Sequence, residues 1–171
     1  ARVSAQVTRT DIGMTPVRVH EVAEEALLLA GPRLREQSVI AEQDHDPDAP
    51  PVQANRLCLK RALLNLVDNA RDAMPSGGTL WLQSAEKDNG VCIVLADSGS
   101  GLGTDSPEEL FKPFVTTRNG AVGLGLCVVK RVVELHGGSL VLNNGKEGGA
   151  EARIHLPFEA RSRRMIGEAH T

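Results

Sequence analysis

The sequence predicts an α+β fold, a two-layer sandwich with helices on one face of a mixed, mostly antiparallel sheet. Three segments repeat apolar residues at helical spacing, and two pairs of shorter segments with strand character flank turns. Strands joined by such turns are antiparallel. With 171 residues and 41% hydrophobic content, the chain is long enough to bury one core.

The first half of the chain begins with a helix over residues 19–37, whose first turns carry glutamates that a helix dipole favours. A short strand is expected over residues 39–43, followed by a proline- and aspartate-rich loop. The second helix covers residues 55–74 and stops at the Pro-Ser-Gly-Gly run that follows. The first hairpin pairs residues 79–86 with residues 91–96 around Asp-Asn-Gly.

The second half starts with residues 97–122, a segment rich in glycine and hydroxyl residues and longer than an ordinary connection. A third helix is expected over residues 123–136, and the closing strands over residues 139–143 and 150–156. The predicted domain spans residues 16–158. Residues 1–15 are expected to be a tail or a remnant of an upstream element, and residues 159–171 a loose tail.

Charge and composition exclude several classes of partner. The net charge of −3 and the 2% aromatic content give no basic or stacking surface for nucleic acid, and no polybasic patch for direct membrane contact. Cys58, Cys92 and Cys127 are widely separated and lack the spacing of a metal or redox site. No apolar run is long enough to span a bilayer, so we expect a cytoplasmic domain even if the full-length protein is membrane-anchored.

The second helix carries a polar row inside an apolar sequence. Asn65, Asn69 and Asp72 share one helical face. Carboxamide and carboxylate oxygens are hard ligands suited to Mg²⁺, which takes one or two such ligands beside phosphates and water. The alternative is a polar stripe facing solvent.

An acidic residue at a strand end precedes closely spaced glycines in the run Asp97-Ser-Gly99-Ser-Gly101-Leu102. An aspartate at a pocket floor can accept a hydrogen bond from an exocyclic amine such as adenine N6, and glycine lets backbone approach a flat ring. The alternative is a common turn with aspartate at its first position.

Two further runs could meet phosphate. Residues 111–118 hold two of the three phenylalanines, with hydroxyls and a guanidinium free to contact phosphate oxygens; a small hydrophobic cluster under a loop is the alternative. Residues 120–126 place glycines at the start of the third helix, where free amides and the dipole favour anions, although many such helices bind nothing.

In this order and at these separations, the four runs resemble the catalytic domain of sensor histidine kinases, within the superfamily shared with gyrase and a heat-shock chaperone. Asn65 and Asn69 match its asparagine box, and Asp97, Gly99 and Gly101 its first glycine box. Phe111, Pro113 and Phe114 match its phenylalanine box, and Gly123 and Gly125 its second glycine box. The match covers about residues 16–158 and looks most like the nitrogen-regulatory class. It implies a Bergerat-type ATP-binding fold with ATP under a lid.

The resemblance implies an Mg-ATP site. Asn69 would hold Mg²⁺ with Asn65 beside it, both in catalytic roles, and Asp97 would recognise adenine. The residues implied in nucleotide binding are Asn65, Asn69, Asp72, Asp97, Gly99, Gly101, Leu102, Phe114, Thr116, Thr117, Arg118, Gly123, Leu124, Gly125 and Leu126. Two departures from the family pattern are Ala121-Val122 before the second glycine box and arginine, where lysine is common, at position 118.

The implied function is transfer of the γ-phosphate of ATP to a histidine on a separate dimerisation and histidine-phosphotransfer domain of the same kinase. The phosphoryl group would pass next to an aspartate of a response regulator. That phosphoacceptor domain is expected to be absent from this chain, whose five histidines are scattered. The alternatives are an anti-sigma-type serine kinase of the same superfamily and a degenerate module that binds nucleotide without transfer.

Overall fold

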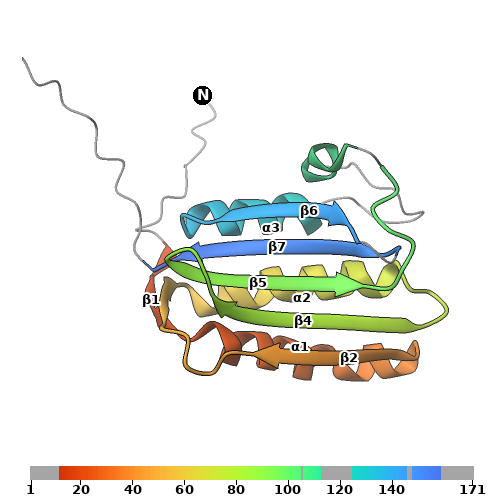
Figure 1. Ribbon diagram of the computed structural model, residues 1–171, viewed down its shortest axis with the longest axis horizontal. Helices are drawn as coiled ribbons and strands as arrows, with labels where there is room; N and C mark the ends of the chain where they lie inside the picture. Colours follow the sequence, from red (N-terminus) through yellow and green to blue (C-terminus); the bar gives the residue numbers. More distant parts are fainter. Residues whose placement is uncertain (1–11, 105, 113–124, 146–147, 159–171) are drawn as a thin grey trace, which may run out of the picture.

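A five-stranded sheet covered on one face by three helices forms the body of the domain (Figure 1). The computed structural model describes residues 12–104, 106–112, 125–145 and 148–158. The helices are α1 (Val19–Glu36), α2 (Arg56–Asp72) and α3 (Gly125–Leu135), with the short 3₁₀ helix η2 (Pro107–Phe111). The strands of the sheet are β2 (Val39–His45), β4 (Gly78–Glu86), β5 (Gly90–Asp97), β6 (Ser139–Asn144) and β7 (Ala150–Pro157). The predicted α+β class is confirmed.

The strand order is β2-β4-β5-β7-β6. The two predicted hairpins, β4–β5 and β6–β7, are both antiparallel, and β5 pairs antiparallel with β7. Strand β2 pairs with β4 in parallel, from Val39 opposite Gly78 to His45 opposite Ser84. This parallel pairing, made across the α2 connection, makes the sheet mixed.

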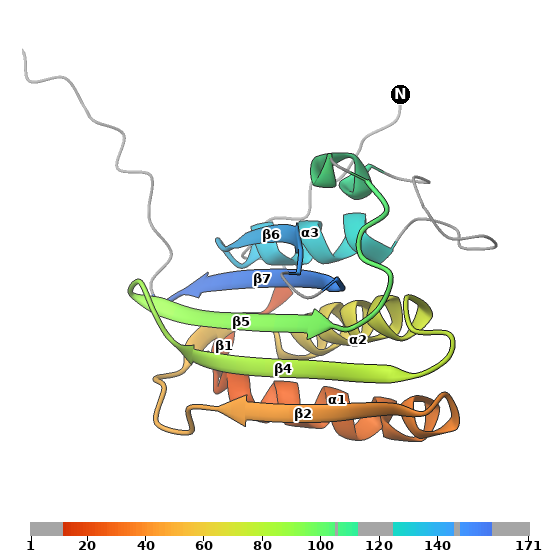
Figure 2. The same ribbon diagram turned by 45° about the vertical axis from the view of Figure 1, so that its right-hand side comes forward.

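The core lies between the sheet and the helices, which Figure 2 shows stacked behind the strands. Alternate strand residues such as Leu80, Ile93 and Ile154 are at most 1% exposed, because the strand period of two directs them all to the helical face. Leu59 and Leu63 of α2 are fully enclosed on the other side of the core. Each such side chain stabilises the fold by about 1.5–3 kcal/mol through burial.

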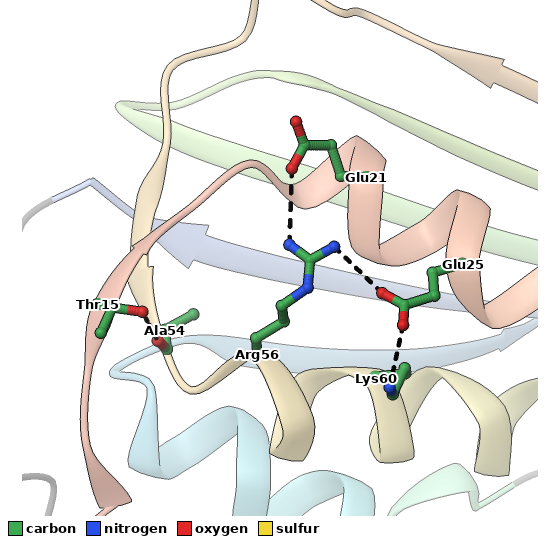
Figure 3. Close-up of polar contacts among 6 residues, drawn as sticks. All are labelled: Thr15, Glu21, Glu25, Ala54, Arg56 and Lys60. Atoms are coloured by element: carbon green, nitrogen blue, oxygen red, sulfur yellow. Dashed lines mark hydrogen bonds and ion pairs between the residues drawn. The ribbon is translucent and has the colours of Figure 1, made fainter.

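Helices α1 and α2 are also joined by a charged network on their exposed flank (Figure 3). The Arg56 guanidinium lies 3.6 Å from the Glu21 carboxylate and 3.1 Å from that of Glu25, which also accepts a hydrogen bond from Lys60 Nζ at 3.1 Å. Lys60 first and Arg56 second hold the pKa of Glu25 below its usual value. Because these side chains are exposed or only partly buried, each of the ion pairs contributes little to stability.

Three short elements differ from the sequence expectation. Strands β1 (Thr15–Val17) and β3 (Val52–Ala54) form a separate antiparallel pair, so Thr15, expected in the unstructured tail, is the first residue of a strand. A three-residue strand is too short to show a hydrophobic period. Helix η2 lies within the segment predicted to be a loop. Residues 1–11 of the predicted N-terminal tail (residues 1–15) and the whole predicted C-terminal tail, residues 159–171, lie outside the described residues.

The sequence also led to expectations about the cysteines and about membrane-spanning segments. Among the described residues, Cys58, Cys92 and Cys127 form no disulfide, and all three are partly buried. Among the helices that the structure describes, none is both long and apolar enough to cross a membrane.

Candidate nucleotide site

Asn69, in the polar row of α2, lies beside the beginning of α3. Asn65 and Asn69 are half-buried, whereas Asp72 is exposed and has a carboxylate oxygen 3.6 Å from the Arg71 guanidinium. A Cβ built on Gly125, the first residue of α3, would lie 3.8 Å from both terminal atoms of the Asn69 side chain. The asparagine row and the second glycine run, 56 positions apart in sequence (125 − 69), therefore meet in space.

Asp97 is the last residue of β5 and its side chain is buried, with 7% exposed. Its Oδ1 accepts hydrogen bonds from the backbone N–H groups of Gly99 at 2.8 Å and Ala150 at 3.3 Å. Burial raises the pKa of Asp97 above its usual value, and the two backbone donors oppose that shift. Within the described part of the chain, both hydrogen bonds go to Oδ1, which leaves Oδ2 to receive a further donor such as an exocyclic amine.

The glycine run after Asp97 packs against the end of α2. A Cβ on Gly99 would lie 2.4 Å from the carbonyl oxygen of Ala73, and the backbone N–H of Ser100 donates to that oxygen at 3.2 Å. Only glycine allows so close an approach between two backbones. This contact holds Asp97 beside the asparagine helix, at the end of the molecule where both α2 and β5 terminate (Figure 1).

Three site residues were missed in the sequence, and all lie at the turn between β6 and β7. Asn144 Oδ1 accepts a hydrogen bond from the N–H of Leu102 at 2.9 Å, beside Gly101, which has a φ of +84°. A Cβ on Gly149 would lie 1.6 Å from the carbonyl oxygen of Asp97, and Ala150 donates to the Asp97 side chain. The two glycines at positions 148 and 149 were the available signal, since a glycine pair in a hairpin turn suggests a close backbone approach.

Helix α3 and η2 border the site from the other side. Lys130 of α3 places its Nζ 4.8 Å from the centre of the Phe111 ring, at the end of η2, and Leu126 packs partly buried against the core. This cation–π contact joins the start of the predicted phenylalanine run to the helix that follows it. The predicted residues Phe114, Thr116, Thr117, Arg118, Gly123 and Leu124 lie outside the described residues.

The described site therefore brings together a half-buried carboxamide, a buried carboxylate with one uncommitted oxygen, and the first residue of a helix. They come from the ends of α2, β5 and α3. The carboxylate can accept a hydrogen bond from an amine, and the carboxamide can supply an oxygen to a hard cation. The backbone amides at the start of the helix can bind an anion.

A comparison of the sequence with known protein families identifies the family of this chain. Residues 54–160 match the family model described as histidine kinase-, DNA gyrase B- and HSP90-like ATPase. The matched region contains α2, the whole site and four of the five sheet strands. The chain belongs to this ATPase family.

Relatives in this family include proteins named as sensor proteins and as sensor histidine kinases. The chain is 36% identical over 146 residues to the C4-dicarboxylate transport sensor protein DctB of Pseudomonas aeruginosa, covering 82% of this chain and 24% of that protein. It covers 22% of the DctB of Rhizobium meliloti, so the chain spans about a quarter of the length of these relatives.

Solved structures give the same result. The catalytic domain of histidine kinase ThkA superposes with a TM-score of 0.78 at 26% identity, covering 85% of this chain and 96% of that one. ThkA in complex with response regulator protein TrrA gives 0.76 at 25% identity, covering 88% and 43%. Full-length ShkA in complex with AMPPNP gives 0.75 at 25%, covering 88% and 34%. The predicted class, a histidine-kinase-type ATP-binding domain, is confirmed; the nitrogen-regulatory subclass stays a prediction.

Proposed function

We propose that this domain binds Mg-ATP and presents the γ-phosphate to a histidine on a separate dimerisation and phosphotransfer domain of the same kinase. The observation that carries the proposal is the meeting of Asn69, Asp97 and Gly125 at one end of the molecule. The family match supports ATP as the nucleotide, and the ShkA structure contains the ATP analogue AMPPNP.

In this proposal each described residue has one task. The Oδ2 of Asp97 accepts a hydrogen bond from the adenine 6-amino group, while its Oδ1 stays bonded to the N–H groups of Gly99 and Ala150. The backbone amides at the start of α3 face the phosphates, which the helix dipole also favours. Asn65 and Asn69 line the opposite wall. These residues bind and orient; positioning and charge neutralisation provide the catalysis.

The donor set near Asn69 fits a magnesium ion. A carboxamide oxygen is a hard ligand, and Gly125 presents no side chain toward it, so phosphate oxygens and water can approach from that side. Magnesium bound there would neutralise charge on the phosphates. Asn69 would be its protein ligand. Asp72 is exposed and lies 3.6 Å from the Arg71 guanidinium, so it would influence the nucleotide only through its charge and not by direct contact.

The partners follow from the same proposal. The phosphohistidine would donate to an aspartate of a response regulator, and the ThkA–TrrA complex supports a regulator as the class of partner. We propose that residues 16–158 suffice for nucleotide binding, and that the domain works in the cytoplasm without binding membrane or nucleic acid.

The test separates the proposal from its two alternatives. The chain is mixed with Mg²⁺, ATP labelled at the γ-phosphate, and the dimerisation domain of its own kinase supplied as a second polypeptide. Acid-labile, base-stable label on that domain supports histidine transfer. Acid-stable label would indicate a serine kinase instead, and calorimetric ATP binding without any label would indicate a nucleotide-binding module.

A further inference from the structure

The most enclosed polar side chain of the described residues lies outside the proposed nucleotide site. Three polar or charged residues are buried in the described part of the chain, namely Ser84, Asp97 of the proposed site, and His136. His136 is 2% exposed and directly follows α3, far along the helix from Gly125. A buried imidazole is costly unless both ring nitrogens are satisfied, so its partners show what it does.

The two ring nitrogens of His136 join two helices. Nε2 accepts a hydrogen bond from the backbone N–H of Asn55 at 3.0 Å, and Nδ1 lies 2.7 Å from the carbonyl oxygen of Val132. Because the Asn55 N–H can only donate, Nε2 must carry the lone pair and Nδ1 the proton, which it donates to Val132. The contacts thus select one neutral tautomer.

Asn55 is the residue at which α2 begins. Its Oδ1 accepts from the N–H of Cys58 at 2.9 Å, its carbonyl oxygen accepts from Leu59 at 3.0 Å, and its side-chain amide donates to the carbonyl of Ile12. With its N–H bonded to His136, every polar group of this N-cap is used. The imidazole therefore fixes where α2 starts relative to the end of α3.

The two helices run antiparallel and touch at both ends. At one end the His136 ring holds Asn55; at the other, Gly125 faces the Asn69 side chain. Between these points α3 is held by apolar side chains such as Val129 and Val133. Apolar burial is non-directional and holds α3 against α2, whereas a hydrogen bond fixes the position of α3 along the axis of α2.

We propose that His136 is a positioning residue for the nucleotide site, because its Nε2–Asn55 hydrogen bond sets the register of α3 against α2 and thereby the separation of Gly125 and Asn69. The inference rests on the proposed nucleotide-binding function for its consequence, but the register itself is a property of the free domain. His136 does not contact nucleotide in this proposal.

Two variants isolate the bond. In His136→Gln the side-chain oxygen can take the place of Nε2 and accept from Asn55. In His136→Asn the shorter amide can still donate to the Val132 carbonyl but cannot reach Asn55. Val133→Ala serves as the control, since it removes buried packing from α3 and leaves the polar link intact. The three variants are compared for thermal midpoint without nucleotide and for the calorimetric Kd of Mg-ATP.

The Kd of Mg-ATP should rise about tenfold in His136→Asn and stay within about twofold of the parent in His136→Gln. In Val133→Ala the Kd should not change, even if its thermal midpoint falls as far as that of His136→Asn. Equal Kd values for His136→Asn and Val133→Ala would overturn the inference and leave His136 a core residue only.

A second measurement keeps the test independent of nucleotide binding. In ¹⁵N–¹H spectra of the free domain, the Asn69 side-chain amide and the Gly125 backbone amide should shift in His136→Asn and stay in place in Val133→Ala. If the parent binds no ATP but these signals shift, the proposed function fails and the register role stands. If the signals do not shift, the register role fails.

Discussion

Replacing Asp97 by asparagine should remove nucleotide recognition and spare the fold. The asparagine carbonyl oxygen can still accept from the N–H groups of Gly99 at 2.8 Å and Ala150 at 3.3 Å. The substitution changes only the other terminal atom, which becomes an NH₂ donor in place of a carboxylate oxygen. An adenine 6-amino group would then face a donor, and the bond would be lost.

The size of the effect follows from the kind of bond. A hydrogen bond to a charged group contributes about 1.5–3 kcal/mol, so ATP affinity should fall about tenfold to a hundredfold. Stability should change in the opposite sense. Burial raises the pKa of Asp97, so the folded state disfavours its charge, and the neutral amide removes that cost at neutral pH.

The raised pKa of Asp97 also makes the stability of the parent depend on pH. A carboxyl group whose pKa is raised on folding binds its proton more tightly in the folded state, so the parent gains stability as pH falls through the raised pKa toward the usual value of 3.8. Asp97→Asn should lack this contribution, and its thermal midpoint should change less with pH over that range.

The assay is calorimetric titration of the parent and Asp97→Asn with ATP and with GTP, beside thermal unfolding without nucleotide. The parent should prefer ATP, because GTP presents a carbonyl oxygen where adenine presents the amine. Equal ATP and GTP affinity in the parent, or undiminished ATP affinity in Asp97→Asn, would refute this role of Asp97.

Three further predictions test other parts of the site. Asn69→Ala should abolish the Mg²⁺ dependence of ATP affinity with an unchanged circular dichroism spectrum; a large loss of thermal stability would indicate a packing role instead. Gly149→Ala should strongly destabilise the fold and weaken ATP binding, because its Cβ would lie 1.6 Å from the Asp97 carbonyl oxygen. The control Gly31→Ala meets only the end of the Arg35 side chain within α1 and should leave ATP binding unchanged. Finally, this chain alone with Mg-ATP should form no phosphohistidine, since His20 lies within the first turn of α1, whose apolar face is in the core; acid-labile label on His20 would contradict this.

Long elements were predictable because each buries one face. Helix α2 was expected over residues 55–74 and spans Arg56–Asp72, and β4 differs from its expected range by one residue. Both contain enough residues for their period to show. The parallel pairing of β2 with β4 was not predicted, because it depends on a crossover through α2 and not on a local turn.

The candidate site was predictable to the extent that its chemistry is local. Asp97 and the glycines after it stand together in sequence, so their likeness to a nucleotide-binding run could be recognised. The residues that hold them in place could not. The Asn144 side chain accepts from the Leu102 N–H across 42 positions, and the Ala150 N–H donates to the Asp97 side chain across 53, so neither pairing shows in a local sequence pattern.

Helix α2 holds the asparagine row in a fixed position because both of its ends form directional hydrogen bonds. At its C-terminal end the carbonyl of Ala73 accepts from the Ser100 N–H, and at its N-terminal end the Asn55 N–H donates to His136. Apolar burial on the core face would allow the helix to slide or turn slightly with little change in buried area. Two directional bonds at opposite ends remove that freedom. Asn65 and Asn69 are therefore positioned by polar contacts with the first glycine run and with α3, the two segments that border the proposed nucleotide.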